Sequence, residues 1–373
     1  MHVPAAFAGV CLIVLVLVDG FNTIVLARRT RHMFRITRIF YRLSWTPFAA
    51  IARRIQSGRR REGFLSIYGP LSLLTLLALW AVGLVIGFGL LQWAAGMQPA
   101  REHADLANDL YISATTLITL ATGDPRNAGS KFIGALEGGL GISFLGLVIG
   151  YLPVLYQSFS RRELRISLLD ARAGSPPSAE ALLRDETRRP EKIEDQLQQW
   201  EEWAAELLEN QLSFPMLGYF RSHHANQSWL TALVAMMDAT ALILLSSDRD
   251  LRTQAALTFA MGRHALADLR ATFGLKPVCP PPDRLGNAEF KRLRETVAAA
   301  RGPLQARRMT EAELRDWREM YEPDACALAD HFLMALPTWL SHDSTRENWR
   351  TNLREREKTP FAVSDPFREE PGK

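Results

Sequence analysis

The chain contains 373 residues, of which 47% are hydrophobic, and it carries a formal net charge of +4 at pH 7. A charge this small gives no reason to expect a nucleic-acid partner. The three cysteines, Cys11, Cys279 and Cys326, lie far apart and form no CxxC motif, so we expect reduced thiols and neither a disulfide framework nor a zinc site.

The apolar residues are concentrated in the N-terminal part of the chain, in three runs that cover residues 7–26, 68–91 and 131–159. Each run has at least the ~20 residues that an α-helix needs to cross a bilayer. No Lys or Arg precedes the first run and arginines follow it directly, which favours an uncleaved signal anchor with its N-terminus outside. Asp19 lies inside this run and is a candidate functional residue, the alternative being packing or pairing near the inner interface.

Residues 28–61 are densely basic, with apolar side chains between the arginines. Because positive charge collects on the cytoplasmic side of membrane proteins, this segment predicts a cytosolic loop. An amphipathic helix lying on anionic lipids is compatible with that location. A voltage-sensing helix is excluded, because its arginines would have to recur at every third position inside an apolar span.

The segment between the second and third runs combines a helix start with a short stretch of small and β-branched residues. Asn108 and Asp109 supply the chemistry of a helix N-terminus, and residues 119–123 end at Asp124-Pro125. Non-helical backbone at membrane depth is tolerated only where protein buries it or where it lines a water-filled cavity. A short helix followed by extended backbone between two spans is therefore typical of a pore lining.

The sequence Thr-Thr-Leu-Ile-Thr-Leu-Ala-Thr-Gly-Asp-Pro at 115–125 resembles the pore-helix and selectivity-filter signature of the potassium channel superfamily. The filter of that family usually reads Thr-Val-Gly-Tyr-Gly-Asp. The resemblance covers residues 68–162. The matching positions are Thr115 and Thr116 of the pore helix and Thr119, Gly123 and Asp124 of the filter. The sequence departs from the family at Ala121, where a glycine is usual, and at Thr122, where an aromatic residue is usual.

The resemblance implies a homotetramer in which four copies of the loop surround an axis. The expected oxygen ligands for potassium or another monovalent cation are the backbone carbonyls of Thr119, Leu120, Ala121 and Thr122, with the Thr119 hydroxyl at the inner end. Asp124 at the outer mouth would attract cations. Ala121 disfavours the left-handed backbone that glycine adopts, by ~1 kcal/mol. Potassium preference, passage of monovalent cations without selection, and loss of conduction therefore all stay open.

The third apolar run contains many glycines and one acid. Most of the glycines are explained by close helix packing, and Gly141 and Gly146 are the candidates for a gating hinge. Glu137 must pair, be protonated or face water. It is a candidate to buttress the filter or to bind a cation, the alternative being a protonated, hydrogen-bonded structural role.

The C-terminal half shows helical periodicity up to about residue 340. Its apolar segment 228–245 is short for a span and contains Asp238, so we predict a core helix of a soluble domain. Thr310 and Glu313 form a capping-box pattern. The histidines lack metal-ligand spacing, and the chain contains no phosphate-binding loop, nucleophile elbow or HExxH motif. The histidines in question are His223, His224, His264 and His331. The C-terminal half is thus a candidate for assembly of the tetramer, for partner binding or for signal transmission to the third span.

Together these patterns predict an all-α membrane protein with three transmembrane helices, a re-entrant pore helix and filter, and a helical cytosolic C-terminal domain. We expect it in the cell (inner) membrane, as a tetrameric cation channel without a cofactor or enzymatic activity, with anionic lipids near its basic loop. The alternative is a non-conducting, membrane-anchored signalling or interaction protein. The predicted domains are an N-terminal transmembrane anchor (1–27), a basic cytosolic loop (28–66), a pore module (67–160), a linker (161–190), a helical cytosolic domain (191–345) and a disordered tail (346–373).

Overall fold

In the computed structural model, all the regular elements of the described residues are helices, and these residues contain no β-strand. The chain divides into two compact units. The first comprises residues 1–161 and 208–221, and the second comprises residues 162–207 and 222–373. The all-α class is thus confirmed. The described residues are 2–24, 36–95, 106–118, 128–174, 176–184, 190–223, 227–246, 248–299 and 309–340.

Among the described residues, three helices are long and apolar enough to cross a membrane, and they coincide with the three predicted spans. They are α1 (His2–Ile24), α3 (Gly58–Ala95) and α5 (Ala128–Ala173), and their apolar segments have mean hydropathies of 2.3, 2.4 and 1.9. At 1.5 Å per residue, α3 is roughly 57 Å long and so exceeds the ~30 Å hydrocarbon core of a bilayer. Both α3 and α5 therefore extend well beyond the predicted spans.

Helix α1 packs against α3 through small residues and one buried acid. A Cβ on Gly87 would lie 2.6 Å from Ile13, so only glycine permits this approach of the two helices. Asp19 is 3% exposed and accepts hydrogen bonds from the Trp80 indole (3.0 Å) and the Thr37 hydroxyl (2.7 Å). The structure therefore places Asp19 in a structural role, joining α1, α3 and the beginning of α2.

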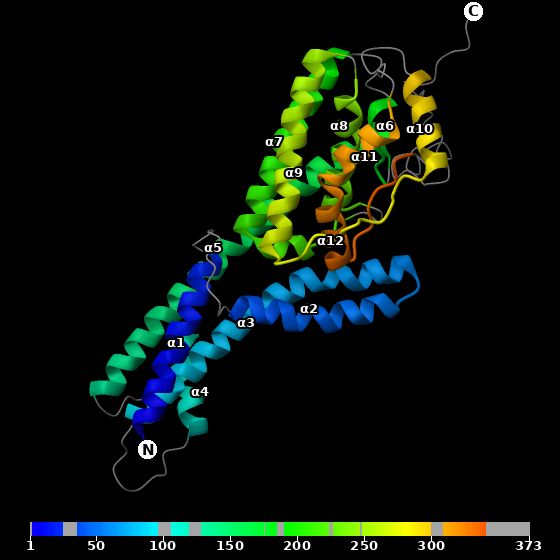
Figure 1. The fold of residues 1–373 in the computed structure, drawn as a ribbon. Helices are drawn as coiled ribbons and strands as arrows, with labels where there is room; N and C mark the ends of the chain where they lie inside the picture. Colours follow the sequence, from blue (N-terminus) through cyan, green and yellow to red (C-terminus); the bar gives the residue numbers. More distant parts are fainter. Residues whose placement is uncertain are drawn as a thin grey trace, which may run out of the picture. The chain divides into compact units, whose positions relative to one another are not determined.

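The predicted basic loop is helical in its described part, which contains α2 (Ile36–Arg54) and the first turns of α3. The reason is an aromatic face on α2 that packs on α3, with ring centroids 4.2 Å apart for Phe48 and Phe64 and 4.7 Å apart for Trp45 and Tyr68. Figure 1 shows α2 beside the first part of α3, which then bends toward α1. Pro70 lies inside α3, where it removes a backbone hydrogen bond to the preceding turn, and proline is a common cause of helix bends.

The second unit is built around α8 (Trp229–Leu244), which is buried at every position from Trp229 to Ile243. The prediction that this segment is a core helix is confirmed, since the protein's own helices cover it (Figure 1). The capping box at Thr310 is also confirmed. The predicted linker is partly helical, because α5 continues to Ala173. The other helices are α6 (Ala179–Arg184), α7 (Pro190–Ser213), α9 (Arg249–Thr272), α10 (Asn287–Ala299), α11 (Glu311–Glu319) and α12 (Glu322–Phe332), with a 3-10 turn at Pro215–Tyr219.

Candidate pore module

A short helix, α4 (Leu106–Leu117), lies between the two long helices α3 and α5 in the sequence, where the pore helix is predicted. It begins two residues before Asn108, so that residue is inside the first turn, together with Asp109. The predicted filter residues Thr119, Leu120, Ala121, Thr122 and Gly123 and the mouth residue Asp124 lie outside the described residues.

Helix α4 packs closely on α3. The Ser113 hydroxyl oxygen lies 2.9 Å from the Val85 carbonyl oxygen of α3. A Cβ on Gly89 would lie 2.7 Å from the Leu110 side chain, so a larger residue there would displace Leu110. The two helices are therefore in close contact through Ser113 and through the fit of Leu110 against Gly89.

Glu137 of α5 is fully buried and connects α5 to the other two helices of this module. Its carboxylate accepts a hydrogen bond of 2.6 Å from the Gln92 amide on α3 and a short one from the Ser113 hydroxyl on α4. Each carboxylate oxygen thus has a donor, which meets the requirement that a buried acid be hydrogen-bonded. Among the roles predicted for Glu137, the geometry supports bracing of α4 from behind.

The partners of Glu137 were missed at the level of the sequence. Gln92 and Ser113 are polar residues in otherwise apolar helices, and both are buried, at 8% and 0% exposure. In the sequence, these residues stand out only as a glutamine near the end of an apolar run and a serine in the predicted pore helix. The sequence could not pair them with Glu137, because the contact depends on how three helices are rotated about their axes.

The two candidate hinge glycines have different surroundings. The Cα of Gly141 faces the backbone carbonyl of Leu117, the last residue of α4, so closely that no Cβ fits. By contrast, a Cβ on Gly146 would have nothing within 4 Å. Gly141 is therefore a packing residue, whereas Gly146 lies on an open face of α5.

The hydroxyls of the two pore-helix threonines bond to their own helix. Thr115 donates to the Ile112 carbonyl at 2.9 Å, and Thr116 donates to the same carbonyl at 2.8 Å. Their side chains therefore satisfy their polar groups locally.

Much of the apolar surface of α5 is not covered by this one chain. Only 11% of its apolar segment is buried. Small residues lie on the same helix, and a Cβ on Gly134, Gly138 or Gly150 would have nothing within 4 Å. In a membrane this surface would contact lipid or other helices. The large exposed side chains include Phe132, Leu136, Ile142, Leu145, Ile149 and Val154.

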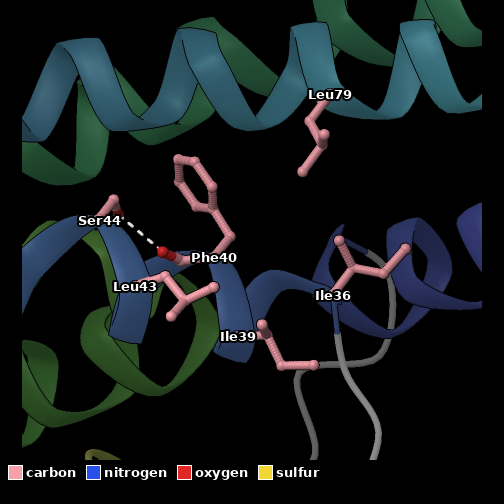
Figure 2. A pocket seen from close by; sticks show the side chains of 6 residues that line it. All are labelled: Ile36, Ile39, Phe40, Leu43, Ser44 and Leu79. Atoms are coloured by element: carbon pink, nitrogen blue, oxygen red, sulfur yellow. Dashed lines mark hydrogen bonds between the residues drawn. The ribbon is translucent and has the colours of Figure 1, made fainter.

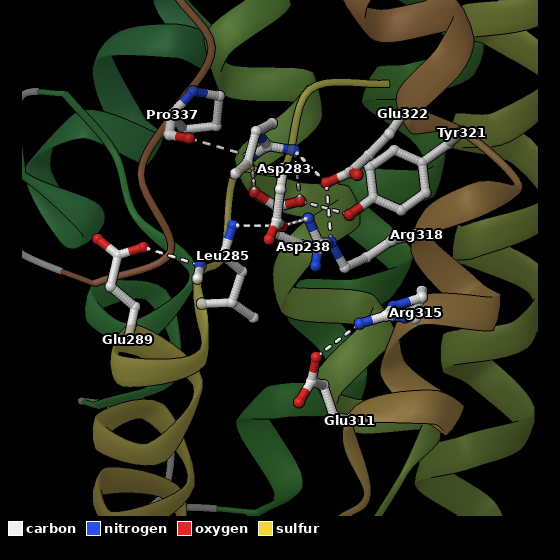
Figure 3. A network of polar contacts seen from close by, with 12 residues as sticks. Asp238, Asp283, Leu285, Glu289, Glu311, Arg315, Arg318, Tyr321, Glu322 and Pro337 are labelled. Atoms are coloured by element: carbon white, nitrogen blue, oxygen red, sulfur yellow. Dashed lines mark hydrogen bonds and ion pairs between the residues drawn. The ribbon is translucent and has the colours of Figure 1, made fainter. Parts of the chain in front are cut away.

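A buried polar network lies in the second unit around Asp238, in the middle of α8 (Figure 3). Asp238 is 0% exposed and pairs through both oxygens with Arg284, and it accepts a short hydrogen bond from Tyr321. Glu322 accepts hydrogen bonds from Arg284 (3.1 Å) and Arg318 (3.0 Å). Burial raises the pKa of Tyr321 well above its ordinary value, so this hydroxyl remains a donor. The network holds α8 to the segments around it.

In the described residues, no three His, Cys, Asp or Glu side chains form a group that could hold a metal ion. Of the histidines considered, His264 lies 3.7 Å from Asp268 and His331 packs against Phe273. His224 lies outside the described residues.

No protein-family model, curated protein or solved structure matches this chain.

Proposed function

We propose that this chain is one subunit of a homotetrameric channel for monovalent cations in the cell (inner) membrane. The observation that carries the proposal is the bracing of α4 between two membrane-length helices by Gln92, Ser113 and Glu137. Helix α4 ends at Leu117, directly before the filter-like sequence 119–124. A rigid support behind a short helix is what a filter of backbone carbonyls needs, because ion coordination depends on fixed positions.

Two further observations support the same assembly. The negative end of the α4 dipole is at Leu117, which favours a cation beyond that end of the helix. The uncovered apolar and small-residue face of α5 is suited to contacts with further copies of the chain. In this proposal α3 is the outer helix and α5 is the inner helix, with Gly146 as a candidate hinge.

The arginine-rich segment 28–61 orients the proposed subunit. Positive charge on the cytoplasmic side would place α2 and the C-terminal unit in the cytoplasm and the N-terminus outside. The proposed permeant ions are potassium and other monovalent cations, with weaker discrimination than the family shows. Ala121 and Thr122 are the reason, because they replace the residues that usually shape and brace the filter.

The test is electrical recording from the purified, full-length protein in a planar bilayer. We expect cation currents that Thr119→Ala alters and that Thr116→Ala leaves nearly unchanged, since the Thr116 hydroxyl is bonded within its own helix. Reversal potentials in opposing potassium and sodium gradients then report selectivity. Absence of current across voltage, pH and calcium conditions would contradict the proposal.

The second candidate is a non-conducting membrane anchor whose C-terminal unit binds a partner. It is favoured by the size and independent core of that unit, which contains the fully buried helix α8. Silent bilayers, together with stable capture of a cytosolic protein by the membrane-inserted chain, would select this candidate.

A further inference from the structure

A crevice between α2 and α3 is not used by the proposed pore. It has a volume of about 520 Å³. Figure 2 shows Phe40 of α2 and Leu79 of α3 pointing into the space between the two helices. The lining residues are Ile36, Ile39, Phe40, Leu43, Ser44 and Leu79.

The lining offers almost no polar chemistry to a ligand. Its one hydroxyl, that of Ser44, already donates to the Phe40 carbonyl at 2.7 Å and lies 2.8 Å from the Tyr68 hydroxyl. A water-soluble ligand would therefore gain no hydrogen bond from these side chains. An aliphatic chain fits this lining, because its burial needs only apolar contact.

The crevice is continuous with exposed apolar surface on both helices. Ile39 and Leu43 of α2 are 50% and 69% exposed, and Leu79 of α3 is 42% exposed. The α3 residue belongs to an apolar segment long enough to cross a bilayer. An aliphatic chain in the crevice would thus lie beside the other acyl chains of the membrane.

Two arginines on α2 supply the complementary charge for a headgroup. Arg38 and Arg42 are both exposed and are four residues apart, so they lie on one side of the helix. They directly precede Ile39 and Leu43 in the chain. Guanidinium groups bind phosphate oxygens through paired hydrogen bonds, which suits an acidic phospholipid at the boundary between headgroups and acyl chains.

We propose that this crevice is a binding site for one anionic phospholipid, with an acyl chain against Phe40 and Leu79 and its phosphate on Arg38 and Arg42. The proposal rests on the membrane-spanning character of the helices and does not depend on ion conduction. Its occupant is a lipid rather than a peptide, because the crevice opens onto apolar surface and its backbone groups are engaged within helices.

The test uses the full-length protein in nanodiscs with a trace of phosphatidylglycerol that carries a diazirine on one acyl chain. After illumination, mass spectrometry is expected to find the label on the lining residues of α2 and on Leu79. The same diazirine on phosphatidylcholine should label these residues several-fold less. Excess unlabelled phosphatidylglycerol should displace the probe from the wild-type protein, whereas excess phosphatidylcholine should not.

Substitutions distinguish the contribution of the lipid headgroup to binding from that of the acyl chain. Arg38→Gln and Arg42→Gln should each reduce labelling about fivefold, the factor that corresponds to ~1 kcal/mol per basic residue at an acidic membrane surface. Leu79→Trp should fill the crevice and abolish labelling there, whereas Leu74→Trp, at an exposed α3 position outside the lining, should not. Equal labelling by both lipids, or labelling spread evenly over the exposed faces of α1 and α5, would overturn the proposal. Either result would leave the proposed channel function untouched, because that proposal is tested by currents in planar bilayers.

Discussion

Glu137 of α5 accepts a hydrogen bond of 2.6 Å from Gln92 of α3, although 45 residues separate them. Ser113 of α4 donates to the other carboxylate oxygen. Three helices of the first unit are thus joined at one buried carboxylate. A displacement of α5 at this level would strain its hydrogen bonds to α3 and α4.

We expect Glu137→Ala to destabilise the first unit by about 1–3 kcal/mol, because it leaves the buried Gln92 amide without its acceptor, whereas the Ser113 hydroxyl keeps the Val85 carbonyl within reach. Glu137→Gln should cost less, since its amide oxygen retains one acceptor. Thermal unfolding in detergent measures both effects. The control is Leu136→Ala, at a neighbouring residue that is 49% exposed. Equal melting temperatures for the alanine variants would show that the carboxylate does not hold the helices together.

The glycines of α5 provide a matched pair of substitutions. Gly141→Ala should displace α5 from α4 and lower the melting temperature, because the Leu117 carbonyl occupies the space of the new methyl group. Gly146→Ala has open space and should raise stability by up to ~1 kcal/mol through helix propensity. If Gly146 is the gating hinge, its variant will alter open probability in bilayers without loss of stability. Similar destabilisation by both substitutions would contradict the assignment of Gly141 as the packing residue.

The buried network around Asp238 predicts that its loss will strongly destabilise the second unit. Asp238→Ala leaves Arg284 buried without its bidentate partner and should cost about 3–5 kcal/mol. The control is Asp316→Ala, at an exposed position of α11, which should change stability by less than ~0.5 kcal/mol. Chemical denaturation followed by circular dichroism measures the difference. A small effect of Asp238→Ala would mean that the buried pair contributes little to folding.

Two cysteines of the second unit should differ in reactivity. Burial raises the pKa of the Cys326 thiol from 9.0 to about 11, whereas Cys279 is exposed. At pH 8 only about one Cys326 in a thousand is a thiolate. A thiol reagent should therefore modify Cys279 rapidly and Cys326 only after unfolding, with Cys279→Ser as the control. Rapid modification of both thiols in the folded protein would contradict the burial of Cys326.

The raised pKa of Cys326 also determines how the stability of the second unit depends on pH. Because the pKa of Cys326 is higher in the folded than in the unfolded protein, ionisation favours unfolding. The stabilising contribution of this thiol is complete below its ordinary pKa of 9.0 and is lost as the pH rises toward 11. Cys326→Ala should reduce the loss of stability between pH 8 and 10. An unchanged pH profile would show that this thiol does not contribute.

Local patterns were sufficient to predict the long apolar helices, the core helix α8 and the start of α11, but not the helices in the basic segment and the linker. Continuous apolar runs identified α1, α3 and α5, because a bilayer-spanning helix needs a fixed length of apolar residues. The same criterion identified α8 as a core helix, since its 16 residues are too few for a span. The capping pattern at Thr310 marked the start of α11, because its hydrogen bonds form within one turn.

Only the tertiary structure decided which residues act together. The sequence required that Glu137 and Asp238 find partners, but Gln92 and Arg284 lie 45 and 46 residues away from them. Gly141 and Gly146 are equivalent in the sequence and different in the structure, since one faces α4 and the other does not. The physical reason is that burial and hydrophobicity are properties of a local segment, whereas a contact depends on how helices distant in the chain are rotated and packed.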